Sequence, residues 1–159
     1  MMKRALILVL SLLMLVFCIP ALAESADWNY DANYAILRGY DGAGGDVVVP
    51  AEIDGFTVDV IGVSVFKGDT ITSLTLPETL EIRYEIPTCE NLTSVTLPQS
   101  LVVINRMNFF SCTTLSEITI PAGVRYIGDT SFRFCDALRK ITFEGVCPAI
   151  DMDCFTILP

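Results

Sequence analysis

Residues 92–121 read LTSVTLPQSLVVINRMNFFSCTTLSEITIP, and this stretch decides the fold because its opening phrase returns at its end. The phrase LTSVTLP begins at Leu92 and comes back as LSEITIP at Leu115, 23 residues later. Further copies are ITSLTLP at 71–77, LRKITF at 138–143 and, in a degenerate form, DVVVP at 46–50. An internal period of this length is typical of a solenoid, in which every repeat forms one coil of the chain.

Each copy of the phrase predicts one short strand. Its fourth and sixth positions are apolar and its fifth is polar, which is the alternation of a strand that is buried on one face. Proline follows at Pro77, Pro98 and Pro121, and it ends the strand because it has no N–H to donate to a neighbour. One coil alone cannot bury enough apolar surface to offset the entropy lost on ordering it. The coils therefore have to stack on one another.

The N-terminus has the three parts of a secretory signal peptide. Lys3 and Arg4 precede an apolar run, and an Ala-x-Ala site ends at Ala23. The run approaches the roughly 20 apolar residues of a membrane span, so an uncleaved anchor is the alternative, but the Ala-x-Ala site favours cleavage after Ala23. We expect a secreted or cell-surface protein whose mature form is not in the membrane.

The remaining chain divides into a cap and a repeat region. Residues 24–45 are expected to form an N-terminal capping strand and turn, in which Trp28, Tyr30 and Tyr34 cover the open end of the first coil. Residues 46–159 are expected to form the solenoid. Its coils are predicted at about 46–70, 71–91, 92–114 and 115–137, with a partial coil at 138–159.

Composition argues against several classes of function. The chain of 159 residues contains no histidine, which excludes Ser–His and Cys–His nucleophile pairs and zinc sites that use histidine. Without Lys3 and Arg4, 8 of the 10 basic residues remain against 19 acidic ones, a net charge of −11. Such a surface repels phosphates, so nucleic acid is not an expected partner. We expect no catalytic residue, metal or cofactor, and an enzyme that uses carboxylates alone is a third alternative.

Longer segments of the sequence resemble the BspA-like leucine-rich repeat family of bacterial surface and secreted proteins. The resemblance is carried by LTSVTLPQSLVVI, by LSEITIPAGVRYIGDTSFRFCDALRKITF and by GYDGAGGDVVVPAEIDGFTVDVIGVSVFKG, and it covers nearly all of the chain after the signal peptide. It implies a leucine-rich-repeat right-handed superhelix with one parallel β-strand per coil and returns rich in loops and turns. It also implies adhesion or binding to a host or cell-surface partner.

Stacked coils align equivalent positions into files about 4.8 Å apart. The outward third and fifth positions of the phrase are polar, and they are Ser73, Thr75, Ser94, Thr96, Glu117, Thr119, Lys140 and Thr142. One interpretation is a partner-binding face on the open side of the sheet, where solenoids usually bind. The other is that threonine is simply a favourable residue on an exposed strand.

Three cysteines, Cys89, Cys112 and Cys135, repeat at the same 23-residue step. Their parallel Cα–Cβ bonds do not suit disulfide geometry, so the sequence predicts a file of buried, reduced thiols. Cys147 and Cys154 lie off this file and are a possible disulfide, since an exported protein meets an oxidising environment.

Besides the carboxylate enzyme, two functions remain open at this point. The first is a secreted or cell-surface binding module for a protein or glycan, without catalysis. The alternative is a structural fragment of a larger repeat array, which associates with itself through its C-terminal edge because an exposed edge strand is a template for pairing.

Overall fold

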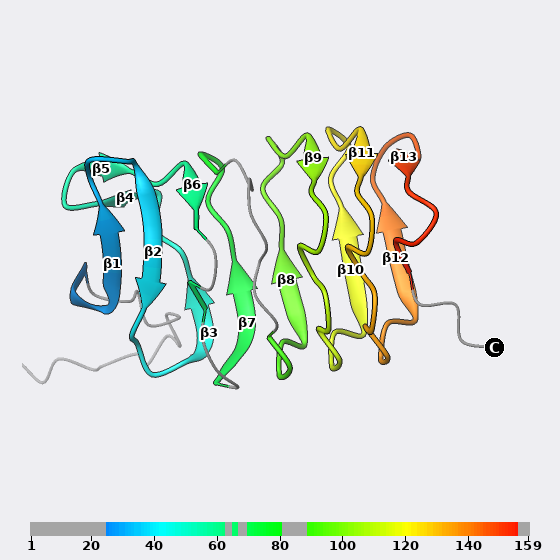
Figure 1. Ribbon diagram of the computed structural model, residues 1–159, viewed down its shortest axis with the longest axis horizontal. Helices are drawn as coiled ribbons and strands as arrows, with labels where there is room; N and C mark the ends of the chain where they lie inside the picture. The colour runs from blue at the N-terminus through cyan, green and yellow to red at the C-terminus, as the bar shows by residue number, and fades with distance from the viewer. Residues whose placement is uncertain (1–24, 63–64, 67–69, 81–88, 156–159) are drawn as a thin grey trace, which may run out of the picture.

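The computed structural model describes residues 25–62, 65–66, 70–80 and 89–155 of the chain. These residues form a solenoid of stacked coils, whose strands follow one another from the N-terminal end to the C-terminal end (Figure 1). The predicted fold class is thereby confirmed. The predicted signal peptide, residues 1–23, lies outside the described residues.

The longer strand of each coil belongs to what we call the major sheet. Its strands are β3 (Gly45–Val48), β7 (Ile71–Thr75), β8 (Ser94–Thr96), β10 (Glu117–Ile120) and β12 (Lys140–Phe143). Neighbouring strands are parallel and their register follows the repeat, so that Leu74 pairs with Val95 and Ile118 with Ile141. Hydrogen bonds join β3, β7 and β8 into one group and β10 and β12 into another. Each copy of the phrase is therefore a strand, as predicted.

A second, minor sheet was not predicted. Its two-residue strands are β9 (Val103–Ile104), β11 (Tyr126–Ile127) and β13 (Ala149–Ile150), and they pair in parallel with Ile104, Ile127 and Ile150 in register. Each described coil from β9 onward thus contributes two strands and not one. The sequence could not indicate them because two residues are too few to display the alternation of a strand.

The N-terminal end of the solenoid is covered by an antiparallel pair. A short 3-10 helix, η1 (Ser25–Asp27), leads into β1 (Trp28–Asp31), which pairs with β2 (Ile36–Tyr40). β2 then pairs in parallel with β6 (Val60–Ile61) of the first coil. Between β3 and β6, β4 (Glu52–Ile53) and β5 (Phe56–Thr57) form a small hairpin.

Two of the three aromatic residues expected in the cap pack as predicted. Trp28 is only 6% exposed, and its ring centroid lies 4.5 Å from that of Tyr40. Tyr30 is partly buried and stacks on Phe56 at 5.9 Å. The prediction for Tyr34 was wrong. Tyr34 is 70% exposed because it lies in the turn between β1 and β2, away from the first coil.

The interior consists of files of equivalent side chains. Phe109 stacks on Phe132 with 5.2 Å between the ring centroids, and Phe132 stacks on Phe155 at 5.5 Å. Leu92 and Leu115 form a second file and are fully buried. These contacts join residues 23 positions apart, so the burial of each coil depends on the coil beside it.

Threonine hydroxyls tie each coil to the one before it. Thr93 Oγ1 donates to the carbonyl oxygen of Thr72 at 2.9 Å, and Thr114 Oγ1 donates to that of Glu90 at 2.6 Å. These bonds add side-chain links between adjacent coils to the backbone bonds that already join them.

The return segments repeat in backbone conformation as well. Met107 and Thr130 both have positive φ, 61° and 56°, and so do Ser111 and Phe134, at 59° and 61°. A non-glycine residue rarely adopts this left-handed conformation. Its recurrence after 23 residues indicates that adjacent coils follow one backbone path outside the strands too.

The predicted file of reduced thiols is confirmed. Cys89, Cys112 and Cys135 are buried and free. The Cys135 thiol donates to the carbonyl oxygen of Phe109 at 3.0 Å. Burial raises the pKa of Cys89 and Cys135 to about 12 and that of Cys112 to about 11. These thiols fill space inside the stack and stay protonated at neutral pH.

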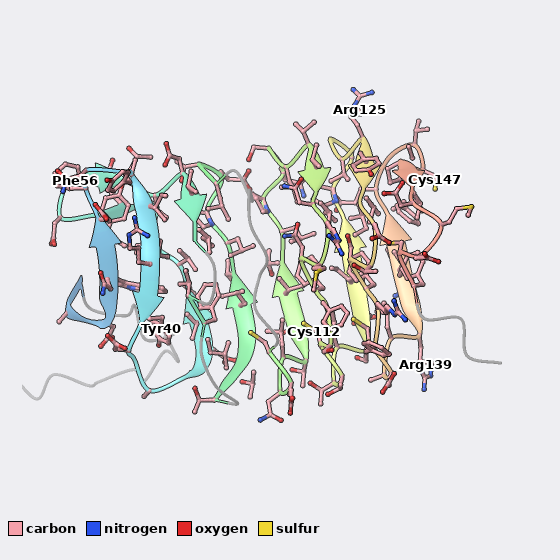
Figure 2. The ribbon with its side chains drawn as sticks, in the orientation of Figure 1. Tyr40, Phe56, Cys112, Arg125, Arg139 and Cys147 are labelled. Atoms are coloured by element: carbon pink, nitrogen blue, oxygen red, sulfur yellow. The ribbon has the colours of Figure 1, made fainter. Side chains whose placement is uncertain are left out.

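The possible disulfide between Cys147 and Cys154 is not formed. Both residues are free, with Cys147 exposed and Cys154 fully buried. Because Phe155 pairs with Phe132, Cys154 occupies the interior position that Ser131 has one coil earlier. Cys147 lies on the outer loop before β13 (Figure 2).

Replacement of Leu115 by alanine is expected to lower the free energy of unfolding by about 2–5 kcal/mol, because it leaves a cavity between two coils. Urea denaturation followed by circular dichroism measures the change. The control is Val102→Ala, since Val102 is 53% exposed, and its effect should stay within about 0.5 kcal/mol. Equal losses in the two variants would contradict an interior built from stacked files.

In the folded protein at about pH 8, iodoacetamide is expected to modify Cys147 and to spare Cys89, Cys112, Cys135 and Cys154. The spared thiols are buried and their raised pKa leaves almost no thiolate to react. Mass spectrometry of tryptic peptides identifies the modified residues, and the same reaction in urea should modify all five. Modification of Cys112 as fast as Cys147 in the folded protein would refute the buried file.

Candidate functional site

The polar residues predicted to form a binding face lie together on the major sheet. Strand pairing joins Ser73 with Ser94, Thr75 with Thr96, Glu117 with Lys140, and Thr119 with Thr142. All eight side chains are exposed or partly buried, so they form two outward files. Their positions agree with the sequence interpretation, and their role in binding stays a prediction.

A hollow interrupts this face between β8 and β10. Among the described residues the two strands lie close together without ladder pairing. A hollow of about 280 Å³ opens there between Thr96 and Thr119. Its wall also contains Val95, Gln99, Pro121 and Glu144. Sequence reasoning missed it because the copies at 92–98 and 115–121 have the same pattern as the copies whose strands do pair.

The side chains beside the hollow are held by contacts between coils. Gln99 Nε2 donates to a carboxylate oxygen of Glu144 at 3.1 Å, across two coils. The backbone N–H groups of Gln99 and Ser100 donate to the Glu78 carboxylate at 3.0 and 3.1 Å, and they lower the pKa of Glu78. Glu144 is therefore a positioned acidic group in the wall of the hollow, and Glu78 is held against the backbone of Gln99, another residue of that wall.

One exposed ion pair lies on β10 and β12, at the C-terminal end of the polar files. Lys140 Nζ lies 3.5 Å from a carboxylate oxygen of Glu117, and both side chains are mostly exposed. An exposed pair at this distance contributes little to stability. Both charges are consequently available to a partner at the C-terminal end of the face.

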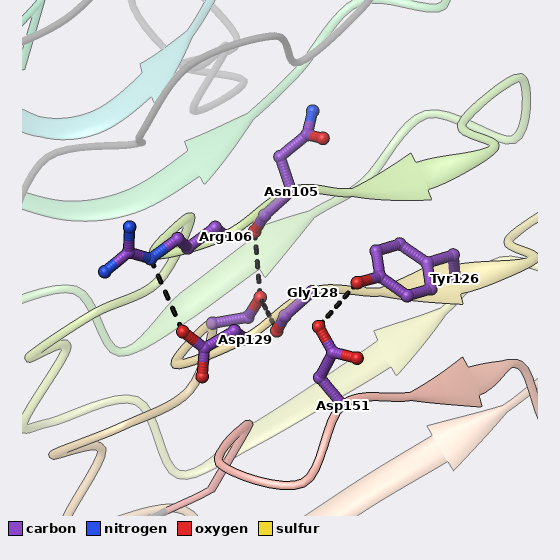
Figure 3. Close-up of polar contacts among 7 residues, drawn as sticks. Asn105, Arg106, Tyr126, Gly128, Asp129 and Asp151 are labelled. Carbon is purple, nitrogen blue, oxygen red and sulfur yellow. Dashed lines mark hydrogen bonds and ion pairs between the residues drawn. The ribbon is translucent and has the colours of Figure 1, made fainter.

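A second polar cluster lies at the coil corner that follows the minor sheet (Figure 3). The Ser131 hydroxyl donates toward the carbonyl oxygens of Asn105 at 2.8 Å and Gly128 at 2.6 Å. The Tyr126 hydroxyl donates to Asp151, one coil further along, and this hydrogen bond raises the pKa of Tyr126.

An ion pair completes the cluster in Figure 3. Arg106 Nε lies 3.4 Å from a carboxylate oxygen of Asp129 in the next coil. Like the bonds of Ser131 and Tyr126, it connects residues of adjacent coils. The contacts of the cluster thus act as clamps between coils.

An exposed aromatic pair on the return segments was also missed from the sequence. The rings of Phe110 and Phe134 form an edge-to-face contact at 5.2 Å, and the guanidinium of Arg133 lies 5.1 Å from the centre of the Phe134 ring. The return segments vary between copies, so no repeated pattern marks this pair. It is a smaller candidate surface than the polar files.

Neither a metal site nor a membrane-spanning helix is found in the described part of the chain. No group of three or more cysteine or acidic residues in it is arranged to hold a metal ion. Within the same residues, no helix has the length and apolar character needed to cross a bilayer.

Comparison with known proteins agrees with the stacked architecture. The structure is similar to a T. pallidum leucine rich repeat protein (TpLRR), with a TM-score of 0.65, 24% identity, and coverage of 84% of this chain and 67% of that one. It is also similar to a leucine rich cell surface protein from Faecalibacterium prausnitzii A2-165, with a TM-score of 0.51, 22% identity, and coverage of 73% and 40%. No curated protein matches the chain in sequence.

The family comparison covers most of the repeat region. The family model described as "BspA type Leucine rich repeat region (6 copies)" matches residues 52–158. This range contains all the strands of the major sheet except β3, and all three strands of the minor sheet. The chain therefore belongs to the BspA-type leucine-rich repeat family.

Proposed function

We propose that this protein is a secreted or cell-surface module that binds a protein or glycan through the outward face of the major sheet. Membership of a leucine-rich repeat family fits a binding or structural module. The observation that carries the proposal is the hollow between Thr96 and Thr119, which opens in the middle of the aligned polar files.

The chemistry of the face suits a neutral or basic polar partner. Threonine and serine hydroxyls both donate and accept hydrogen bonds, so they match peptide groups and sugar hydroxyls equally well. Glu117 and Lys140 lie on the face, Glu144 lines the hollow and Glu78 is bonded to Gln99 beside it, so acidic groups outnumber the basic one among these described residues. An anionic partner such as nucleic acid would be repelled.

The size of the hollow limits what enters it. At about 280 Å³ it lies at the lower end of small-molecule sites. One side chain or one sugar ring of a larger partner fits that volume, with the rest of the partner lying along the files. The proposed role is binding without a chemical step, and the predicted leader at residues 1–23 supports an extracellular location.

A structural role is the second candidate function. It is favoured by the C-terminal coil, where the inward residues Leu138, Ile141 and Phe143 are only partly buried. A larger array or a second molecule would cover them.

The double variant Thr96→Arg/Thr119→Arg is expected to weaken binding by about tenfold or more, because it fills the hollow and adds charge at the centre of the face. The purified protein is first screened against a glycan array and a set of extracellular proteins. Each ligand found is then titrated against wild type and variant by surface plasmon resonance.

The matched control is Val102→Arg, which adds the same charge at an exposed residue beside β9, outside the major sheet. Thermal unfolding establishes that both variants fold. A ligand whose affinity falls equally in both variants, or in neither, would place the binding surface elsewhere.

A further inference from the structure

The C-terminal end of the solenoid is less completely covered than its interior. Leu115 and Ile118 are fully buried, whereas Leu138 and Ile141, which occupy the same positions one coil later, are only partly buried. A hollow of about 320 Å³ lies against this end. Its lining is mixed, with Phe132, Cys135, Leu138, Ile141 and Phe155 beside the charged residues Asp136, Arg139 and Lys140.

The backbone at this end also has an open side. β12 pairs with β10 along one edge, and no strand of the described residues pairs with its other edge. The N–H and C=O groups of that edge are a template for another strand. A strand edge and partly buried apolar side chains thus lie at the same end of the solenoid, beside charged residues. The surface suits another β-strand that carries both apolar and charged side chains.

The sequence of β12 and the residue after it complements itself when two copies run antiparallel. The segment reads Lys140-Ile141-Thr142-Phe143-Glu144. If Thr142 lies opposite Thr142 of a second copy, Ile141 faces Phe143 and Lys140 faces Glu144 of that copy. Residues directly opposite each other share one face of a sheet, so inward apolar residues meet inward ones and opposite charges meet on the outer face.

We propose that the C-terminal end of the solenoid binds the same end of a second copy of this chain, with the two β12 strands paired antiparallel about a twofold axis at Thr142. An interface of this kind is isologous and closes as a dimer. The hollow is then covered by the same end of the second copy. The present contacts of the two charges, Lys140 with Glu117 at 3.5 Å and Gln99 with Glu144 at 3.1 Å, lie on the surface and can be exchanged.

A head-to-tail contact is the less favoured arrangement because the two ends of the solenoid differ. The N-terminal end is covered by β1 and β2, and Trp28 and Val47 there are only 6% and 2% exposed. Tyr34 in the β1–β2 turn and Phe56 in the β4–β5 hairpin are exposed apolar residues at that end, but they belong to the cap and not to a strand of the major sheet. The tail-to-tail dimer would also extend the major sheet across the axis and present two copies of its outward face, which increases avidity for a repetitive partner.

The first experiment is a charge exchange followed by sedimentation velocity over a concentration series. Wild type is expected to show a monomer–dimer equilibrium, and Lys140→Glu or Glu144→Lys alone is expected to raise the dissociation constant by about tenfold or more, because like charges then meet twice. The double variant Lys140→Glu/Glu144→Lys should restore wild-type affinity to within about threefold, since opposite charges meet again.

This rescue separates the interface from effects within one molecule. Residues 140 and 144 are four positions apart on an extended segment, about 13 Å, so their charges do not form a pair inside one copy. A monomer at every concentration, single variants that associate like wild type, or open-ended oligomers would each overturn the proposal.

The second experiment tests the twofold axis directly. In a Cys147→Ser background, Thr142→Cys is expected to form a disulfide-linked dimer under mild oxidation, because directly opposed residues have Cα atoms about 4.5–5.5 Å apart. Thr119→Cys is the matched control, since Thr119 is the same exposed position one coil earlier and pairs with Thr142 within the chain.

Non-reducing electrophoresis compares the two rates of crosslinking. Faster crosslinking through residue 142 supports the proposed axis. Equal rates, or none at residue 142 while the protein is dimeric by sedimentation, would show that the two copies meet elsewhere. Neither measurement needs a binding partner, so a failure here is distinct from a failure of the proposed binding face.

Discussion

Burial of apolar side chains between adjacent coils is the interaction on which the rest of this structure depends. A coil of about 23 residues has no interior of its own, so Leu115 or Phe132 is buried only because a neighbouring coil lies on each side. Stability in such a chain is approximately a sum over neighbouring contacts. This interaction is incomplete at the two ends of the described solenoid, and the ends differ in how far their apolar side chains are covered. Trp28 and the β1–β2 pair cover one end, while Leu138 and Ile141 at the other remain partly buried.

The stacking constraint leaves the outward positions free to serve a function. Inward positions must match their neighbours in size, but Ser73, Thr96, Glu117 and Lys140 face solvent and carry no such requirement. Their alignment follows from strand register and requires no further interaction. The local loss of pairing between β8 and β10 then converts a uniform polar face into one with a distinct hollow. The proposed binding residues thereby lie on a scaffold whose stability does not depend on them.

The same constraint connects the proposed binding face with the proposed dimer. The edge of β12 and the partly covered side chains beneath it belong to the last coil of the major sheet, so association there continues the sheet that carries the polar files. Lys140 and Glu144 are held by exposed surface contacts, which can rearrange when the two copies meet. The proposed association uses Lys140, Thr142 and Glu144, which also belong to the polar files or the hollow, whereas Ser73, Thr75, Ser94, Thr96 and Thr119 lie on the preceding strands and stay free for recognition.

The sequence by itself determined the repeat, the strands of the major sheet, the outward threonine file and the burial of Cys89, Cys112 and Cys135, because a 23-residue period and a two-residue alternation are local patterns that stacking preserves. Only the tertiary structure decided the minor sheet, the hollow at Thr96, the exposure of Tyr34 and the separate environments of Cys147 and Cys154. Two copies with the same sequence pattern can differ in how closely their strands approach, as β8 and β10 do. The β1–β2 turn and the terminal segments occur once in the chain, so no second copy reveals their conformation. Such features depend on distances between segments far apart in the chain, and no local pattern of residues encodes those distances.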